Sequence, residues 1–586
     1  MKLNSKVFFP VVFIIAIQFV TVTPAQDTTW WKATGYDDLQ AMLGANTPDG
    51  AGIAVSQVEA STPSNAYLPD PNNPEFLTPD KNFVNVSGLN NLVSGHADGV
   101  TLRMVGNETS IANGVVDVYV YEVENWLNFG IGFAGGANPQ PHPYAVQNHS
   151  WVAGGIQNSI ALNILARGDY VANENNMNMI CGVGNSQGNA SPQLMVHGYN
   201  SISVGRSDGI HSTGPTTFLG FGRRKPELVA IAGSTSVATA RITSIAAAVR
   251  DMAQGTNAEN NEVTKAIILA GATKSEFTDW DQADNRPIDN VYGVGEANIY
   301  NSYMIFQGGE TDGANGSVTE IAGSEGWDFE SIEAFGSRSY IIDVTEPADH
   351  LSLILTWNRQ IEDANANPNL FLPSPILPDL DVLVTGNGVS VFSESNNHNI
   401  EHVYLKDVEP GQYIVVVFSD RDAEYALAWR TAEIDEEPIT SVDVISGSDK
   451  GGTIADLAAD DGDYFVMRPG LQAGDGFTVS LEFEAMTSIN MPNGIELTLD
   501  AKVNTPNIEV EFEFYNFDQQ EFVSMQTIEA TTTQTAHIGE VFGELNDYID
   551  PAGGGVRARA TWRATGVRAL YPWSVMIDKA SFQISQ

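Results

Sequence analysis

Short apolar runs alternate with alanine-rich stretches over residues 46–305, and this alternation constrains the fold more than any other feature of the chain. The runs AGIAVSQV, VVDVYVYEV and NMICGVG are typical of buried strands, whereas NSIALNILARGDYVA and TSIAAAVRDMAQ are typical of helices. Strands that alternate with helices predict an α/β domain with a mostly parallel sheet flanked by helices.

The pattern changes after the polar, glycine-rich stretch GGETDGANGS at 308–317. Residues 318–433 contain strand-like runs separated by turn residues, with almost no helical periodicity, which predicts an antiparallel β-sandwich. After the acidic segment 433–440, residues 441–586 alternate apolar and polar positions, so we expect a second sandwich or jelly roll. Because both connecting segments are polar, we expect few contacts to cross them.

The N-terminus is typical of an exported protein. Two lysines precede the apolar stretch 7–22, and the small residues TPA follow it, so residues 1–25 are predicted to be a signal peptide. The mature protein is then expected outside the cell or in the periplasm. The alternative is an uncleaved anchor, although the apolar run contains Pro10 and Gln18 and is short for a span. No other segment is long and apolar enough to span a membrane, and the net charge of −45 argues against an anionic membrane as a partner.

Charge and cysteine content narrow the classes of partner and cofactor. The chain has 73 acidic and 28 basic residues, a net charge of −45, which argues against nucleic acid as a partner. Its single cysteine, Cys181, excludes an intrachain disulfide framework and is expected to be a buried small hydrophobe. No cofactor is required by any motif. A structural Ca²⁺ at Asp379 and Asp381 is weighed against the alternative that these are solvated carboxylates.

Ser236 stands at the mouth of a small-residue helix, directly after the strand-like run KPELVAIAG at 225–233. A serine there lies in the positive field of a helix N-terminus, which suits a nucleophile whose attack creates an oxyanion. Ordinary capping of the helix by Ser234, Thr235 or Ser236 is the alternative.

Three upstream residues occur in the order that a hydrolase of the Asp–His–Ser type needs. Glu59 ends an apolar strand, His96 lies at the start of a predicted helix, and Asn185 follows the buried strand MNMICGVG in a Gly-Asn-Ser turn. Each has a structural alternative: a strand-end carboxylate, a helix-start or core histidine, and a turn asparagine.

Residues 46–305 resemble the subtilisin-like serine peptidases at six short segments in the family's order. These segments are GAGIAVSQVEAS, GHADG, GVGNS, YNSISVGRSD, KPELVA and STSVATA. The resemblance implies that Ser236 is the nucleophile, that His96 is the general base, that Glu59 orients His96, and that the side-chain amide of Asn185 helps to hold the oxyanion.

The segment AVQNHSWVAGG resembles the family's substrate-lining strand, so Ser150 and Gly154 are expected to border the substrate pocket. Three residues depart from the family pattern. Glu59 replaces the usual aspartate, Ser234 replaces the glycine before Thr-Ser, and Asp98 adds a charge two residues after His96.

The β regions carry weaker signals. Within 318–433, the runs LSLILTWN, PDLDVLV, NIEHVYL and VEPGQYIVVV resemble the pre-peptidase C-terminal and proprotein-convertase P-like sandwiches. Nothing in 441–586 resembles a known family. There Trp562, Tyr571 and Trp573 could stack on a sugar or polymer, and packing in a core is the alternative.

The sequence therefore predicts a secreted serine endopeptidase that cleaves a protein or peptide substrate through an acyl-enzyme at Ser236. One alternative is an inactive scaffold of the same fold whose β domains bind a surface or polymer. Another is an esterase-like hydrolase that uses the same residues.

Overall fold

The computed structural model describes residues 29–585, except for 275–276, 317–319, 366, 368, 460, 473–475, 488, 490–491, 493, 543–544 and 566–572. The predicted signal peptide at 1–25 lies outside the described residues. The chain forms two compact units, described separately below. The first consists of the described residues up to Thr345, with Leu351–Leu405 and Gly411–Arg430; the second consists of Glu346–His350, Lys406–Pro410 and the chain from Thr431 onward.

A seven-stranded sheet lies at the centre of the first unit, in the order β2-β3-β1-β4-β5-β6-β9, and each neighbouring pair is parallel. The strands are β1 (Val55–Glu59), β2 (Asn82–Asn85), β3 (Asp117–Glu122), β4 (Val146–His149), β5 (Asn178–Gly182), β6 (Ser201–Arg206) and β9 (Leu228–Ala230). The predicted parallel sheet is thereby confirmed.

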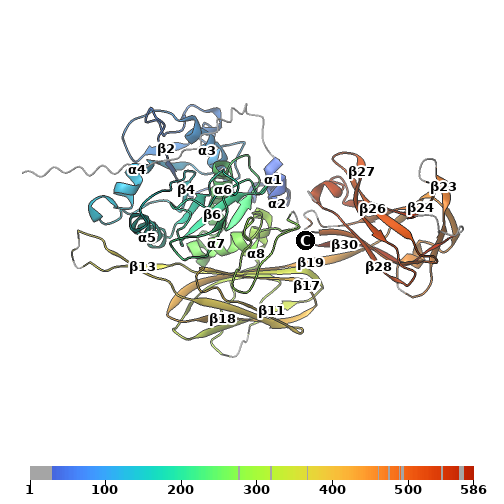
Figure 1. Cartoon of the computed structure of the whole chain (residues 1–586). Coiled ribbons are helices and arrows are strands. Elements are labelled where there is room, and N and C mark those ends of the chain that lie inside the picture. Colours follow the sequence, from blue (N-terminus) through green and yellow to red (C-terminus); the bar gives the residue numbers. More distant parts are fainter. Residues whose placement is uncertain are drawn as a thin grey trace, which may run out of the picture. The chain divides into compact units, whose positions relative to one another are not determined.

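Helices cover both faces of this sheet, and the side chains of strand β1 contribute to an apolar core on each face. Val55 belongs to an apolar core shared with α1, α2, α3, α6, α7 and α8, whereas Val58 belongs to a second core shared with α4 and α5. The helices are α1 (Thr29–Ala33), α2 (Tyr36–Leu43), α3 (Gly95–Val105), α4 (Val123–Asn125), α5 (Asn158–Glu174), α6 (Thr235–Met252), α7 (Asn261–Ala270) and α8 (Ile299–Gly308). Figure 1 shows these helices, in blue and green, around the sheet.

Helix α6 is buried over most of its length because its sequence is dominated by small and β-branched residues. Its N-cap is Ser234, whose hydroxyl accepts a hydrogen bond from Val237 N at 3.3 Å. Alanines such as Ala246 and Ala247 let the helix axis approach the sheet closely, so α6 contacts β4, β5 and β6 as well as α3. This packing fixes where the helix begins.

An antiparallel sandwich completes the first unit, as predicted (yellow strands in Figure 1). One sheet has the order β17-β12-β19 with β10 beside β19, and the other has the order β11-β18-β15-β16. The strands are β10 (Glu325–Ile332), β11 (Ser337–Val344), β12 (Ala348–Thr356), β15 (Leu380–Gly386), β16 (Val389–Ser393), β17 (Ile400–Val408), β18 (Gly411–Ser419) and β19 (Ala423–Pro438), with a hairpin of β13 (Gln360–Asp363) and β14 (Pro373–Ile376).

The expectation that few contacts cross 308–317 is wrong. Residues of β10, β12 and β17 join the same apolar core as α7 and α8. Arg167 on α5 donates a hydrogen bond to the Phe371 carbonyl at 2.7 Å, and the buried side chains of Arg359 and Asp169 form an ion pair at 2.6 Å. The interface is formed by α8 and β10, which flank the polar connection, and by residues far from it in sequence such as Arg167 and Arg359, so the composition of the connection does not indicate it. The boundaries 46–305 and 318–433 stay predictions.

The second unit consists of two antiparallel sheets that enclose one apolar core, as expected for a second sandwich. Trp562 and Trp573 are buried in this core, which confirms the alternative of core packing for both; Tyr571 lies outside the described residues. The strands are β20 (Ser441–Ser446), β21 (Ser448–Gly451), β22 (Phe465–Arg468), β23 (Gly470–Gln472), β24 (Gly476–Met486), β25 (Gly494–Val503), β26 (Ile508–Asn516), β27 (Glu521–Glu529), β28 (Thr535–Glu540), β29 (Gly555–Ala564) and β30 (Val575–Ser585).

A search of the described helices finds none with both the length and the apolar character that a membrane span requires.

Candidate active site

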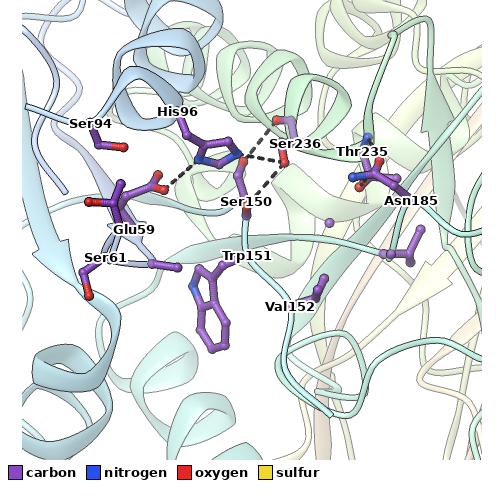
Figure 2. A pocket seen from close by; sticks show the side chains of 15 residues that line it. Glu59, Ser61, Ser94, His96, Ser150, Trp151, Val152, Asn185, Thr235 and Ser236 are labelled. Carbon is purple, nitrogen blue, oxygen red and sulfur yellow. Dashed lines mark hydrogen bonds and ion pairs between the residues drawn. The ribbon is translucent and has the colours of Figure 1, made fainter. Parts of the chain in front are cut away.

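The carboxyl ends of three neighbouring strands meet the start of α6 at one edge of the parallel sheet, where open α/β sheets commonly bind ligands. Glu59 is the last residue of β1, Ser150 follows the end of β4, and Asn185 lies in the turn after β5. Fifteen residues line an open cavity there (Figure 2). They are Glu59, Ala60, Ser61, Thr62, Ser94, His96, Ser150, Trp151, Val152, Gly182, Val183, Gly184, Asn185, Thr235 and Ser236.

Glu59, His96 and Ser236 form a continuous chain of hydrogen bonds (Figure 2). Glu59 Oε1 lies 2.7 Å from His96 Nδ1, and His96 Nε2 lies 3.1 Å from Ser236 Oγ. With its proton on Nδ1, directed at the carboxylate, the imidazole accepts the hydroxyl proton of Ser236 at Nε2. Ser236 Oγ also lies 3.3 Å from the Ser150 carbonyl oxygen, so the hydroxyl has a second acceptor. The geometry suits a nucleophile beside a general base.

His96 is placed by the first turn of α3. The Ser94 hydroxyl caps this helix by accepting a hydrogen bond from Ala97 N at 3.3 Å. The side chain of His96 is 31% exposed, whereas that of Glu59 is 3% exposed. The carboxylate therefore contacts the buried side of the imidazole. The negative charge of Glu59 raises the pKa of His96 above its ordinary value, against the opposing effect of burial.

Asn185 is held in one orientation beside the candidate nucleophile. Its Oδ1 accepts hydrogen bonds from Thr235 N at 2.7 Å and from Thr235 Oγ1 at 2.9 Å. Because the oxygen must face these two donors, the Nδ2 group is the donor that remains for a ligand of the cavity. At the start of α6, Thr235 N donates to Asn185 Oδ1 and Val237 N to Ser234 Oγ, so within the described part of the chain Ser236 N is the backbone donor that remains beside the nucleophile.

Two departures from the family pattern are accommodated without strain. Ser234 has extended backbone angles (φ −156°, ψ 157°), which a residue with a Cβ atom adopts readily, and its hydroxyl caps α6. Asp98 accepts hydrogen bonds from Asp70 N and Asn73 Nδ2, both at 3.0 Å. Its carboxylate therefore anchors the loop before α3.

Of the two predicted pocket residues, Ser150 lines the cavity and Gly154 does not. Ser150 Oγ donates to Asn148 Oδ1 at 2.8 Å and lies 3.1 Å from the Ser236 carbonyl oxygen, which links the end of β4 to α6. The sequence analysis missed Trp151 and Val152, which form a wall of the cavity. Their position next to Ser150 in the resembling segment is the signal that could have identified them.

No protein-family model matches the chain, and no curated protein matches it in sequence. Among solved structures, the chain is similar to tripeptidyl peptidase 2 (TPP II) at 9% identity and a TM-score of 0.26, over 84% of this chain and 54% of that one. It therefore spans about half the length of that protein.

It is also similar to fervidolysin from Fervidobacterium pennivorans, a keratinolytic enzyme related to subtilisin, at 12% identity and a TM-score of 0.31, over 85% of this chain and 69% of that one. A further similarity, to a variant of the family 29 carbohydrate-binding module CBM29-2, has 16% identity and a TM-score of 0.18 over 26% of this chain and 92% of that one. At such TM-scores, no residue role is transferred from these proteins.

Among the described residues, no group of three or more His, Cys, Asp or Glu side chains is placed to hold a metal ion. The structural Ca²⁺ weighed at Asp379 and Asp381 stays a prediction; burial raises the pKa of Asp381 to about 6. Cys181 is buried, as predicted, and burial raises the pKa of its thiol.

Proposed function

We propose that the protein is a secreted serine endopeptidase that cleaves peptide bonds through an acyl-enzyme at Ser236. The observation that carries this proposal is the chain of contacts from Glu59 through His96 to Ser236, 2.7 Å and 3.1 Å long, at the open edge of the sheet. Secretion rests on the predicted signal peptide at 1–25, and the choice of a peptide as substrate rests on the resemblance of residues 46–305.

The proposed reaction begins when His96 Nε2 takes the hydroxyl proton as Ser236 Oγ attacks the substrate carbonyl carbon. The oxyanion that forms is stabilised by Asn185 Nδ2 and the backbone N–H of Ser236. His96 then gives its proton to the leaving amine, and the carbon–nitrogen bond breaks. Water then attacks the acyl carbon as His96 takes its proton, and His96 passes that proton to Ser236 Oγ as the ester bond breaks. Glu59 stabilises the imidazolium in both halves of the reaction.

A second candidate function is a scaffold without activity, whose β regions bind a surface or polymer. The observation that favours it is Glu59, because glutamate carries one methylene more than the aspartate of the family and a 1 Å displacement can cost about 10²-fold in rate.

Labelling of the purified, full-length protein with a fluorophosphonate separates the two candidates, since the probe reacts only with an activated serine. We expect the label on Ser236 and its loss in Ser236→Ala and His96→Ala. Ser61→Ala is the matched control, because Ser61 lines the same cavity but donates to Glu122, so this variant should still be labelled. A folded wild-type protein that stays unlabelled contradicts the peptidase and supports the scaffold.

If Ser236 is labelled, cleavage of an unfolded protein by the wild type and not by Ser236→Ala identifies a peptidase. Hydrolysis of esters alone identifies an esterase.

A further inference from the structure

Gln57 is a buried polar side chain that the proposed mechanism does not use. It lies on β1 two residues before Glu59, and alternate side chains of a strand point to the same face of the sheet. The side chain is fully buried, and burying an amide is costly unless its polar atoms are hydrogen-bonded. Burying an apolar side chain at this position of a central strand would cost less free energy than burying an amide. The hydrogen-bond partners of Gln57 therefore need to be examined.

Both hydrogen-bonding groups of the Gln57 amide have partners. Nε2 donates to Glu59 Oε2 at 3.0 Å and to the Ala97 carbonyl oxygen at 3.2 Å, and Oε1 accepts a hydrogen bond from Thr101 Oγ1. Turning the amide over would place Oε1 against a carboxylate and a carbonyl, both of which are acceptors. The contacts therefore determine the orientation of the amide, with its donor end toward Glu59.

The two carboxylate oxygens of Glu59 thus have different hydrogen-bond partners. Oε1 contacts His96 Nδ1, whereas Oε2 is held by Gln57. Glutamate has one more rotatable bond than aspartate, so its carboxylate needs more restraint to keep one oxygen on the imidazole. Ala97 and Thr101 belong to α3, the helix that carries His96, so the Gln57 amide also links the two elements that position this contact.

We propose that Gln57 is a positioning residue: it holds Glu59 Oε2 so that Oε1 stays on His96 Nδ1, while Thr101 fixes the Gln57 amide. The inference rests on the proposed function and deepens it, since it explains how a glutamate serves at this position. Gln57 is not among the residues that line the cavity, so it acts through Glu59 and not on the substrate.

The first test is Gln57→Leu in the full-length protein, assayed by peptide cleavage across pH. We expect kcat to fall about 10- to 100-fold, because the carboxylate is displaced by a fraction of an ångström to an ångström, while KM changes less than threefold. The acid limb of kcat/KM should move to lower pH as His96 loses part of its contact with Glu59.

The matched control is Gln147→Leu, which removes the fully buried glutamine of the neighbouring strand β4, bonded to Ser56, Tyr144 and His149. It should lower stability and leave the acid limb where it is in the wild type. A shift of equal size in both variants would overturn the proposal, because it would be a general effect of losing a buried amide.

A double-mutant cycle separates positioning from a structural role. If Gln57 acts only through Glu59, then Gln57→Leu introduced into Glu59→Gln should change kcat less than threefold, although it costs 10-fold or more in the wild type. The same fold loss in both backgrounds would contradict the proposal.

Failure of the proposed function is recognised separately, since a wild-type protein that is folded but unlabelled by fluorophosphonate has no activated serine. In that case NMR titration of His96 tests Gln57 without any activity. A lower pKa of His96 in Gln57→Leu than in the wild type supports the positioning role, and an unchanged pKa overturns it.

Discussion

Of the contacts that link Glu59, His96 and Ser236, the one between Glu59 and His96 is the shortest, at 2.7 Å, compared with 3.1 Å from His96 to Ser236 and 3.3 Å from Ser236 to the Ser150 carbonyl. The short distance fits a bond to a charged acceptor, and it comes with a raised pKa for His96. A raised pKa means that the imidazole is protonated, and so inactive as a base, up to a higher pH than an ordinary histidine. The acid limb of kcat/KM should therefore lie above about pH 6.5.

Glu59→Gln should move that acid limb to lower pH, because the negative charge that raises the pKa of His96 is removed. At the same time kcat should fall by roughly 10²–10⁴-fold, since the amide no longer fixes the imidazole tautomer or stabilises the imidazolium. Both changes are measured in one pH–rate profile of the full-length protein. Near-wild-type kcat in a folded variant would remove Glu59 from the mechanism.

At the scale of elements, the order of motifs was enough to predict the constellation. Glu59 ends a strand, Asn185 follows one, and His96 and Ser236 begin helices, so a parallel sheet brings all four to one edge. Gln57 could not be predicted in this way. Its partner Thr101 is 44 residues away, and no local pattern distinguishes a glutamine that bonds a carboxylate from one that faces solvent. Gly154 is not among the residues that line the described cavity, and its place at the substrate pocket stays a prediction.

Strand β10 carries a buried carboxyl that makes stability depend on pH. Burial raises the pKa of Asp328 to about 7, although Tyr340 Oη and Gly313 N donate to its Oδ2 at 2.7 Å and 3.0 Å. A folded-state pKa above the unfolded one means that stability is full below about pH 4 and is lost as pH rises toward 7. An asparagine can accept the same two hydrogen bonds without a charge.

Asp328→Asn should therefore raise the free energy of unfolding at pH 8 by roughly 2–4 kcal/mol, at about 1.4 kcal/mol per pKa unit, and leave it nearly unchanged at pH 4. Thermal unfolding at the two pH values measures this. The matched control is Asp343→Asn, at a half-exposed position of β11, the next strand along the chain. This variant should show no such gain. An equal gain at both pH values would contradict the explanation by charge.

At the scale of the molecule, the α/β region and the first sandwich form one compact unit, whereas the sequence suggested two independent domains. Composition indicates where a chain is exposed between elements. It does not show which distant surfaces pack together, and here the buried ion pair of Arg359 and Asp169 joins the two regions.

We therefore expect a chain that ends at Pro438 to stay folded and to react with fluorophosphonate, because it keeps the strands of the first sandwich. A chain that ends near residue 307 should be insoluble or unlabelled, since apolar surface on α7 and α8 would be exposed and Asp169 would lose its partner Arg359. Solubility, circular dichroism and labelling of the two truncated proteins check this. A folded, labelled protein ending near 307 would show that the sandwich is dispensable for the site.

The hydrogen bond from Gln57 to Glu59 also limits which residues can replace Glu59. Aspartate at position 59 would withdraw the carboxylate by one methylene and leave the fully buried Gln57 amide with one acceptor, the Ala97 carbonyl oxygen, in place of two. Glu59→Asp is therefore expected to be harmful while Gln57 is present. Residues 57 and 59 constrain each other, so both would have to change together for an aspartate to serve at position 59.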